Sequence, residues 1–220
     1  MKRIHIIGTQ RAGTTLMKNL FVCYKDVYIA GGEPLWDQED LFMQENKDTH
    51  HIVSKNPGED ADGGLLEAID NDPNLKVICM VRDPRDILCS IWGDNDAPMW
   101  MQGGNWLSLG SRLDFITRFR IQKGSKVCFV KYEELVTEPE KIQKEIAEFT
   151  GLEIEISFSD WETRRDESTA ADTDEKAMRG FRPPDTNSIG KGKSVGHIQA
   201  LARLDPRLKL FLRYWYGVEV

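Results

Sequence analysis

The stretch Arg3-Ile4-His5-Ile6-Ile7-Gly8-Thr9-Gln10-Arg11-Ala12-Gly13-Thr14-Thr15 decides the fold of this chain. Its apolar beginning predicts a buried strand, and Leu16 and Leu20 predict one face of a helix after the second glycine. A strand, a glycine-bounded loop and a helix form the geometry that presents backbone N–H groups to a phosphate. The alternative is an ordinary turn between strand and helix, in which the glycines serve packing.

The loop departs from the common nucleotide-binding pattern at one position. Gly8 and Gly13 have the separation of the two glycines in G-x-x-x-x-G-K-[ST]. Thr14 stands where that pattern has the lysine that reaches the outer phosphates of ATP or GTP, and the basic residue is Arg11, inside the loop. We therefore expect the loop to hold a phosphate without that lysine.

Length, composition and charge restrict the classes of protein to consider. A chain of 220 residues, 40% hydrophobic and 30% charged, predicts a single globular domain over residues 1–220. The net charge of -7 argues against a nucleic-acid partner. No apolar run approaches the ~20 residues that cross a bilayer, so we expect no membrane insertion. The cysteines have no metal-ligand spacing, and we interpret them as reduced packing residues of a cytoplasmic protein.

Five segments have the pattern of strands, with helical patterns between them: residues 3–8, 27–30, 51–54, 75–81 and 126–131. This alternation predicts a mainly parallel five-stranded sheet with helices on both faces, which is a three-layer α/β fold. Further helices are expected from Asp83 to about Trp92, over 138–151, and over 199–214 with a break near Pro206. The polar stretch 157–187 is expected to be a long loop.

The residues that follow the strands are expected to meet, because ligands of parallel sheets bind beyond the carboxyl ends of the strands. In chain order these residues are Arg11, Glu33, Lys55, Arg82, Tyr132 and Glu133. Arg82 and Ser90, which we place two turns into the next helix, together offer a guanidinium and a hydroxyl to a second phosphate. We interpret Arg85 and Asp86 as structural residues on the exposed face of that helix.

Four segments, in order along the chain, resemble sulfotransferases that use 3'-phosphoadenosine 5'-phosphosulfate (PAPS). Residues 10–15 are similar to the 5'-phosphosulfate loop of that family, and residues 82–86 with Ser90 are similar to its 3'-phosphate motif. Residues 131–135, with Pro139 and 149–152, resemble its tyrosine-containing segment and the helix after it, and residues 188–193 resemble its late glycine-lysine loop. The resemblance implies a P-loop-like α/β fold.

The resemblance also implies which residues bind PAPS and its product, adenosine 3',5'-bisphosphate (PAP). The implied donor-binding residues are Arg11, Ala12, Gly13, Thr14, Thr15, Arg82, Ser90, Tyr132, Ser188, Lys191, Gly192 and Lys193. No metal is required, because side chains supply the positive charge.

Three residues are expected to carry the catalytic chemistry. Arg11 stands where the family has a basic residue that stabilises the leaving oxygen. Glu33 resembles the glutamate general base of tyrosylprotein and carbohydrate sulfotransferases, although it could be only a turn residue before a proline. Lys55 is expected to contact the transferred group; the histidine base of the cytosolic small-molecule branch has no counterpart, since Pro57 stands at its position.

The acceptor is expected to be a small molecule or a carbohydrate, and a homodimer is compatible with the sequence. Segment 92–110, which is expected to be mostly irregular, is either a lid over the acceptor or a loop that packs into the core, and Trp36 is a further candidate to face the acceptor. Two other functions stay open, namely a nucleotide kinase and a protein that binds PAP or PAPS without turnover.

Overall fold

The structure is a computed structural model of the chain. It describes residues 2–38, 50–58, 63–91, 98–101, 106–167 and 186–219. Within these residues, no helix has the length and apolar character that crossing a membrane would need.

Five parallel strands form a single sheet in the order β2-β3-β1-β4-β5. The strands are β1 (Lys2–Gly8), β2 (Val27–Ile29), β3 (His51–Asn56), β4 (Leu75–Val81) and β5 (Val127–Lys131). β1 is central, with its apolar run buried between β3 and β4, and Ile6 lies in register with Lys55 and Ile78. The predicted parallel α/β fold is therefore confirmed. Its central strands are buried on both faces, which explains their near-continuous apolar sequences.

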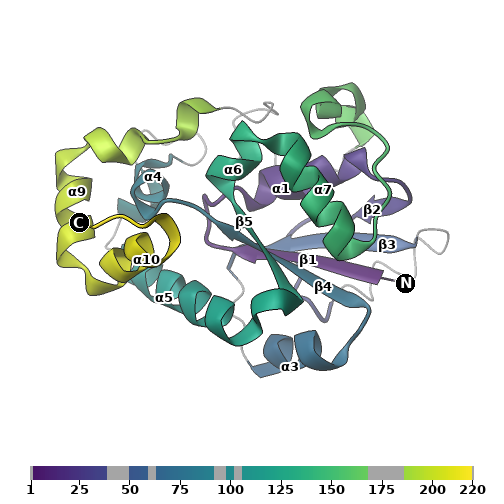
Figure 1. Cartoon of the computed structure of the whole chain (residues 1–220), viewed down its shortest axis with the longest axis horizontal. Coiled ribbons are helices and arrows are strands. Elements are labelled where there is room, and N and C mark those ends of the chain that lie inside the picture. The colour runs from purple at the N-terminus through teal and green to yellow at the C-terminus, as the bar shows by residue number, and fades with distance from the viewer. Residues whose placement is uncertain are drawn as a thin grey trace.

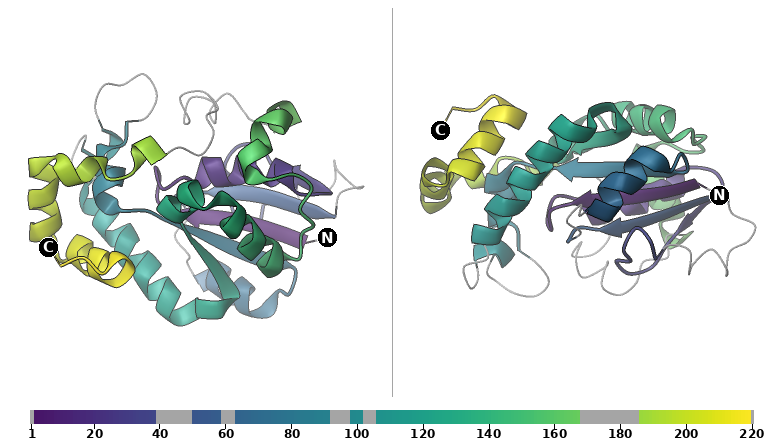
Figure 2. Two further views of the ribbon diagram at one scale, coloured as in Figure 1. Left: turned by 45° about the horizontal axis from the view of Figure 1, so that its top comes forward. Right: turned by 90° about the horizontal axis from the view of Figure 1, so that it is seen from below.

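Helices cover both faces of the sheet (Figure 1). α1 (Thr14–Leu20), α6 (Tyr132–Thr137) and α7 (Pro139–Thr150) lie on one side, whereas α3 (Gly63–Asn71) and α5 (Trp106–Lys123) lie on the other. The short α4 (Pro84–Cys89), α9 (Gly196–Leu204) and α10 (Pro206–Tyr216) gather beyond the carboxyl ends of the strands, as the second orientation in Figure 2 also shows. The residues that follow the strands therefore lie between the carboxyl ends of the strands and the C-terminal helices.

Several expected helix bounds are confirmed, and each has a local cause. α7 ends where Gly151 takes the left-handed conformation, with φ 76°. The predicted break near Pro206 separates α9 from α10, because Asp205 leaves the helix and caps the next one. His5, interpreted as a core residue, is fully buried, with its Nδ1 2.6 Å from the hydroxyl of Ser54.

The helix after Asp83 and the loop expected over 157–187 both need correction. α4 ends at Cys89 because Ser90 is extended (ψ 126°), so Ser90 is not inside the helix, and the helix is shorter than the predicted one to about Trp92. Part of the expected loop 157–187 is a 3₁₀ helix over Phe158–Glu167, which the buried Phe158 and Trp161 anchor; residues 168–185 are not described.

Segment 92–110 was expected to be mostly irregular, but its end is helical. α5 begins at Trp106, and Leu109 is fully buried in it. Trp100 is also buried and donates from its indole nitrogen to the carbonyl oxygen of Gln10, 3.1 Å away. These residues pack into the core; residues 92–97 and 102–105 lie outside the described part of the chain.

Candidate functional site

The glycine-bounded loop between β1 and α1 turns sharply against β4. Arg11 and Gly13 have left-handed φ values of 72° and 97°. A Cβ on Gly8 would lie 2.8 Å from the carbonyl oxygen of Met80, and one on Gly13 would lie 2.6 Å from the Tyr132 ring. Both glycines are therefore required by close approach to these neighbours.

Arg11 and Arg82, which are 71 residues apart in the sequence, come together at the sheet edge. The Nε of Arg11 donates to the hydroxyl of Ser90 at 2.8 Å, and Nη1 of Arg82 donates to the Arg11 carbonyl oxygen at 2.8 Å. The contact between Arg11 and Ser90 depends on the early end of α4, because Ser90 leaves the helix there and turns toward the loop. The two predicted phosphate motifs are therefore parts of one cluster.

Arg82 is also connected to the end of β5 and to the late loop. Its guanidinium carbon lies 4.2 Å from the centre of the Tyr132 ring, a cation–π contact, and Nη2 donates to the Ser188 carbonyl oxygen at 2.9 Å. The hydroxyls of Tyr132 and Ser188 are 2.6 Å apart. The Nε of Arg82 is buried and has no hydrogen-bond partner among the described residues. The buried Nε–H is therefore an unsatisfied donor within the part of the chain that the structure describes.

Asp86 was expected to be exposed, and this expectation is wrong. The residue is 2% exposed, and its carboxylate accepts the backbone N–H groups of Gly190 and Gly192 at 2.7 and 2.8 Å. Arg85 is buried as well, in an ion pair with Asp83. Both residues are structural as predicted, but they face inward because the late loop covers α4.

Glu33 and Lys55 form an ion pair beside the β1–α1 loop. Nζ of Lys55 lies 2.6 Å from Oε1 of Glu33; the lysine side chain is 2% exposed and the glutamate side chain 52%. Lys55 lies inside β3 rather than after it, so the strand fixes its buried stem. The turn after β3 reaches the loop, since a Cβ on Gly58 would be 3.5 Å from the side-chain nitrogen of Gln10.

Trp36, the further candidate to face the acceptor, contacts β1 through its backbone. Its carbonyl oxygen accepts from Arg3, 3.4 Å away, near the beginning of β1. Its side chain is partly buried and packs against the core. Its role toward the acceptor stays a prediction.

Glu133 and Tyr216 connect the site to the C-terminal helix, and Tyr216 was missed by sequence reasoning. The Glu133 carboxylate accepts from the Asp83 backbone N–H at 2.9 Å and from the Tyr216 hydroxyl at 3.0 Å. Burial raises the pKa of Glu133, and burial also raises the pKa of Tyr216. The last turn of α10 thus supports the segment that begins with Arg82.

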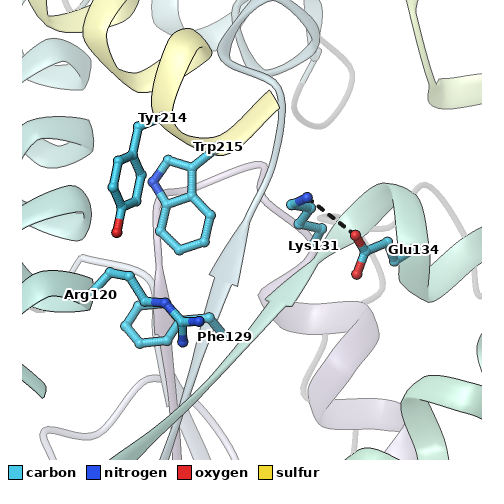
Figure 3. A pocket seen from close by; sticks show the side chains of 6 residues that line it. All are labelled: Arg120, Phe129, Lys131, Glu134, Tyr214 and Trp215. Atoms are coloured by element: carbon cyan, nitrogen blue, oxygen red, sulfur yellow. Dashed lines mark ion pairs between the residues drawn. The ribbon is translucent and has the colours of Figure 1, made fainter. Parts of the chain in front are cut away.

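An open pocket of about 360 Å³ lies outside this cluster, between α5, β5 and α10 (Figure 3). Arg120 stacks on the Phe129 ring at 4.9 Å, while Lys131 pairs with Glu134 at 3.2 Å. Tyr214 and Trp215 of α10 complete its lining. None of the predicted donor-binding or catalytic residues lines this pocket.

Cysteines and acidic residues give no sign of metal chemistry in the described segments. The four cysteines are free thiols, and burial raises the pKa of Cys128 to about 11. No three His, Cys, Asp or Glu side chains come close enough to form a metal site within the described ranges.

Comparison with known proteins gives the family. The chain matches the family model described as "Sulfotransferase domain" over residues 1–200. The sulfotransferase domain from the Synechococcus PCC 7002 olefin synthase has the same fold, with a TM-score of 0.69 and 13% identity over 100% of this chain and 96% of that one. The mouse sulfotransferase SULT7A1, solved in complex with PAP, has a TM-score of 0.61 and 16% identity over 98% and 86%.

None of the curated proteins matches the chain significantly. The two structural likenesses concern the fold, since their identity is low, whereas the family model covers residues 1–200, which include the β1–α1 loop, the ends of β4 and β5 and the late loop. The chain therefore belongs to the sulfotransferase domain family.

Proposed function

We propose that this sulfotransferase moves a sulfuryl group from PAPS to a hydroxyl or an amine of a small-molecule or carbohydrate acceptor. The observation that carries the proposal is the single cluster of Arg11, Arg82, Ser90, Tyr132 and Ser188. These residues come from the phosphate loop, the ends of β4 and β5, the end of α4 and the late loop. Such convergence of cations and hydroxyls suits a ligand with two separate phosphate groups.

The residues present fit both ends of the donor. The Arg82 guanidinium, with the exposed Lys191 and Lys193 on the neighbouring loop, suits the 3'-phosphate. The backbone of the β1–α1 loop and the hydroxyls of Thr14 and Thr15 suit the 5'-phosphosulfate. The mouse sulfotransferase of the same fold was solved with PAP, which agrees with this assignment.

PAPS supplies the sulfuryl group and a phosphate leaving group. The acceptor oxygen or nitrogen forms a bond to sulfur while the sulfur–oxygen bond to the 5'-phosphate breaks. Arg11 neutralises the charge on the leaving oxygen, and Glu33 takes the proton from the acceptor. Lys55 holds the Glu33 carboxylate at 2.6 Å and contacts the transferred group from the floor of the site.

Sulfate transfer from labelled PAPS to a panel of alcohols, sugars, phenols and amines tests the proposal, with the Glu33→Gln variant beside the wild type. Glutamine keeps an oxygen for Lys55 but cannot take a proton, so transfer should fall about 100-fold or more. PAP affinity, measured by calorimetry, should stay within about twofold of the wild type. The matched control is Glu153→Gln, which removes the same charge from an exposed lysine–glutamate pair with Lys25, before β2.

Three results would contradict the proposal. Full activity of the Glu33→Gln variant would remove Glu33 from the role of base. Binding of PAP without transfer to any acceptor of the panel would indicate a binding protein. Stabilisation by ATP and magnesium, but not by PAP, would indicate a kinase.

A further inference from the structure

The late loop has the backbone form of an anion site, but the protein occupies that site with its own carboxylate. Gly190 takes a left-handed φ of 80°, and the residues after it form the short 3₁₀ helix Lys191–Ser194. Successive N–H groups in such a turn point toward one concave place, which commonly binds a phosphate. Here the two oxygens of Asp86 accept the N–H groups of Gly190 and Gly192.

The loop is fixed at this place by packing as well as by hydrogen bonds. A Cβ on Gly192 would lie 2.2 Å from the Arg85 carbonyl oxygen, so the loop backbone lies directly on α4. The side chain of Gln199, on α9, donates to the Gly192 carbonyl oxygen at 3.1 Å. The N–H groups of Gly190 and Gly192 are engaged by Asp86, whereas the side chains of Lys191 and Lys193 are exposed and can meet a ligand.

The late loop also meets the arginine cluster directly. Nη2 of Arg82 donates to the carbonyl oxygen of Ser188, two residues before Gly190, at 2.9 Å. The hydroxyls of Ser188 and Tyr132 are 2.6 Å apart. Asp86 therefore holds the loop next to the point at which the loop contacts Arg82.

We propose that Asp86 is a positioning residue that sets the preference of this site for nucleotides with a 3'-phosphate. By holding Gly190 and Gly192, its carboxylate keeps the late loop, which carries Lys191 and Lys193, next to Arg82 before the donor arrives. This inference rests on the proposed donor. It assigns Gly192 to loop packing, where sequence reasoning had placed it among the residues that contact the donor.

The test compares PAP with adenosine 5'-phosphate, which lacks the 3'-phosphate, by calorimetry on the full chain. Replacing Asp86 with Ala removes two charge-assisted hydrogen bonds, so the affinity for PAP should fall about tenfold or more. The affinity for adenosine 5'-phosphate should change less than about twofold, because the loop from Arg11 to Thr15 is untouched. Asp86→Asn, which keeps one acceptor oxygen, should have an intermediate effect and serves if the alanine variant does not fold.

Asp205→Ala is the matched control, because it removes another buried carboxylate that accepts a backbone N–H near a helix start. It should leave the ratio of the two affinities unchanged. An equal loss for both nucleotides in the Asp86 variants, or no loss for either, would overturn the proposal.

Amide hydrogen exchange separates this inference from the proposed function. In the nucleotide-free wild type the amides of Gly190 and Gly192 should be protected, and Asp86→Ala should remove that protection. A wild type that binds no PAP would overturn both the donor assignment and the role of Asp86 in nucleotide preference. Protection that persists in the variant would show that Asp86 does not hold the loop, whatever the donor.

Discussion

The tripeptide Asp-Pro-Arg occurs twice in this protein, at Asp83-Pro84-Arg85 before α4 and at Asp205-Pro206-Arg207 before α10. Both copies form the same structure. The aspartate accepts the backbone N–H of the arginine at 2.9 Å in the first copy and 2.8 Å in the second, and it also pairs with the guanidinium at 2.6 and 2.9 Å. The proline occupies the first turn of each helix, where its missing N–H costs nothing.

The two copies differ in what surrounds them. Arg82 and Asp86 flank the first copy and bind the β1–α1 loop and the late loop, whereas Leu204 and Leu208 flank the second. Each copy packs against a glycine of another segment, but Gly192 meets the Arg85 backbone and Gly110 meets the end of the Arg207 side chain. The same capping pattern therefore supports contacts with two loops in the first copy, whereas in the second copy it only begins a helix.

The largest expected effect comes from removing each capping aspartate. Asp83→Ala leaves the Arg85 guanidinium, 6% exposed, without its carboxylate, and should cost about 3–5 kcal/mol of unfolding free energy. Asp205→Ala should cost about 1–2 kcal/mol, because Arg207 is 36% exposed and can turn to water. Denaturant unfolding followed by circular dichroism measures both values. Equal losses would mean that burial of the arginine does not distinguish the two copies.

The next effect concerns the two glycines. Gly192→Ala places a Cβ 2.2 Å from a backbone oxygen, so the loop or α4 must move, at a cost of about 1–3 kcal/mol. Gly110→Ala meets only the Arg207 guanidinium, at 2.7 Å, and alanine is better than glycine inside α5 by about 0.5–1 kcal/mol. The Gly110 variant should therefore be nearly as stable as the wild type in the same unfolding experiment. A larger loss for Gly110→Ala than for Gly192→Ala would contradict this reading of the two contacts.

The Asp-Pro-Arg copies also show which parts of the fold the sequence can predict. Capping by Asp83 and the break near Pro206 depend on neighbours in the chain, and both expectations are confirmed. The parallel sheet is equally predictable, because its strands are continuous apolar runs. The end of α4 at Cys89 is not, since Ser90 leaves the helix to meet Arg11, 79 residues away.

The candidate site follows the same division. The rule that strand ends meet at one edge brought Arg11, Arg82 and Tyr132 together correctly. It could not reveal Asp86 or Tyr216, whose partners belong to segments more than 80 residues away. From the sequence alone, an aspartate in the first turn of a capped helix, such as Asp86, is expected to be exposed. Only the structure shows that the late loop covers it.

The smallest expected effect is the pH dependence of the second copy. Burial would raise the pKa of Asp205, but hydrogen bonds from the Arg207 side chain and backbone outweigh it and hold that pKa below its ordinary value of 3.8. A carboxylate with a lower pKa in the folded state stabilises the protein above its ordinary pKa, and this stability is lost as pH falls through the folded value.

The Asp205→Asn variant keeps an oxygen for the Arg207 N–H but has no charge to lose. At neutral pH it should be less stable than the wild type by about 1 kcal/mol. The difference in unfolding free energy should stay constant down to about pH 5 and narrow as pH falls further, below the ordinary pKa of 3.8, because only the wild type loses a charged partner of Arg207. A series of denaturant titrations over this range measures it. A difference in unfolding free energy that stayed constant with pH would show that Asp205 contributes as a helix cap and not as the ion-pair partner of Arg207. The buried ion pair of Arg85 would then be the only electrostatic difference between the two copies.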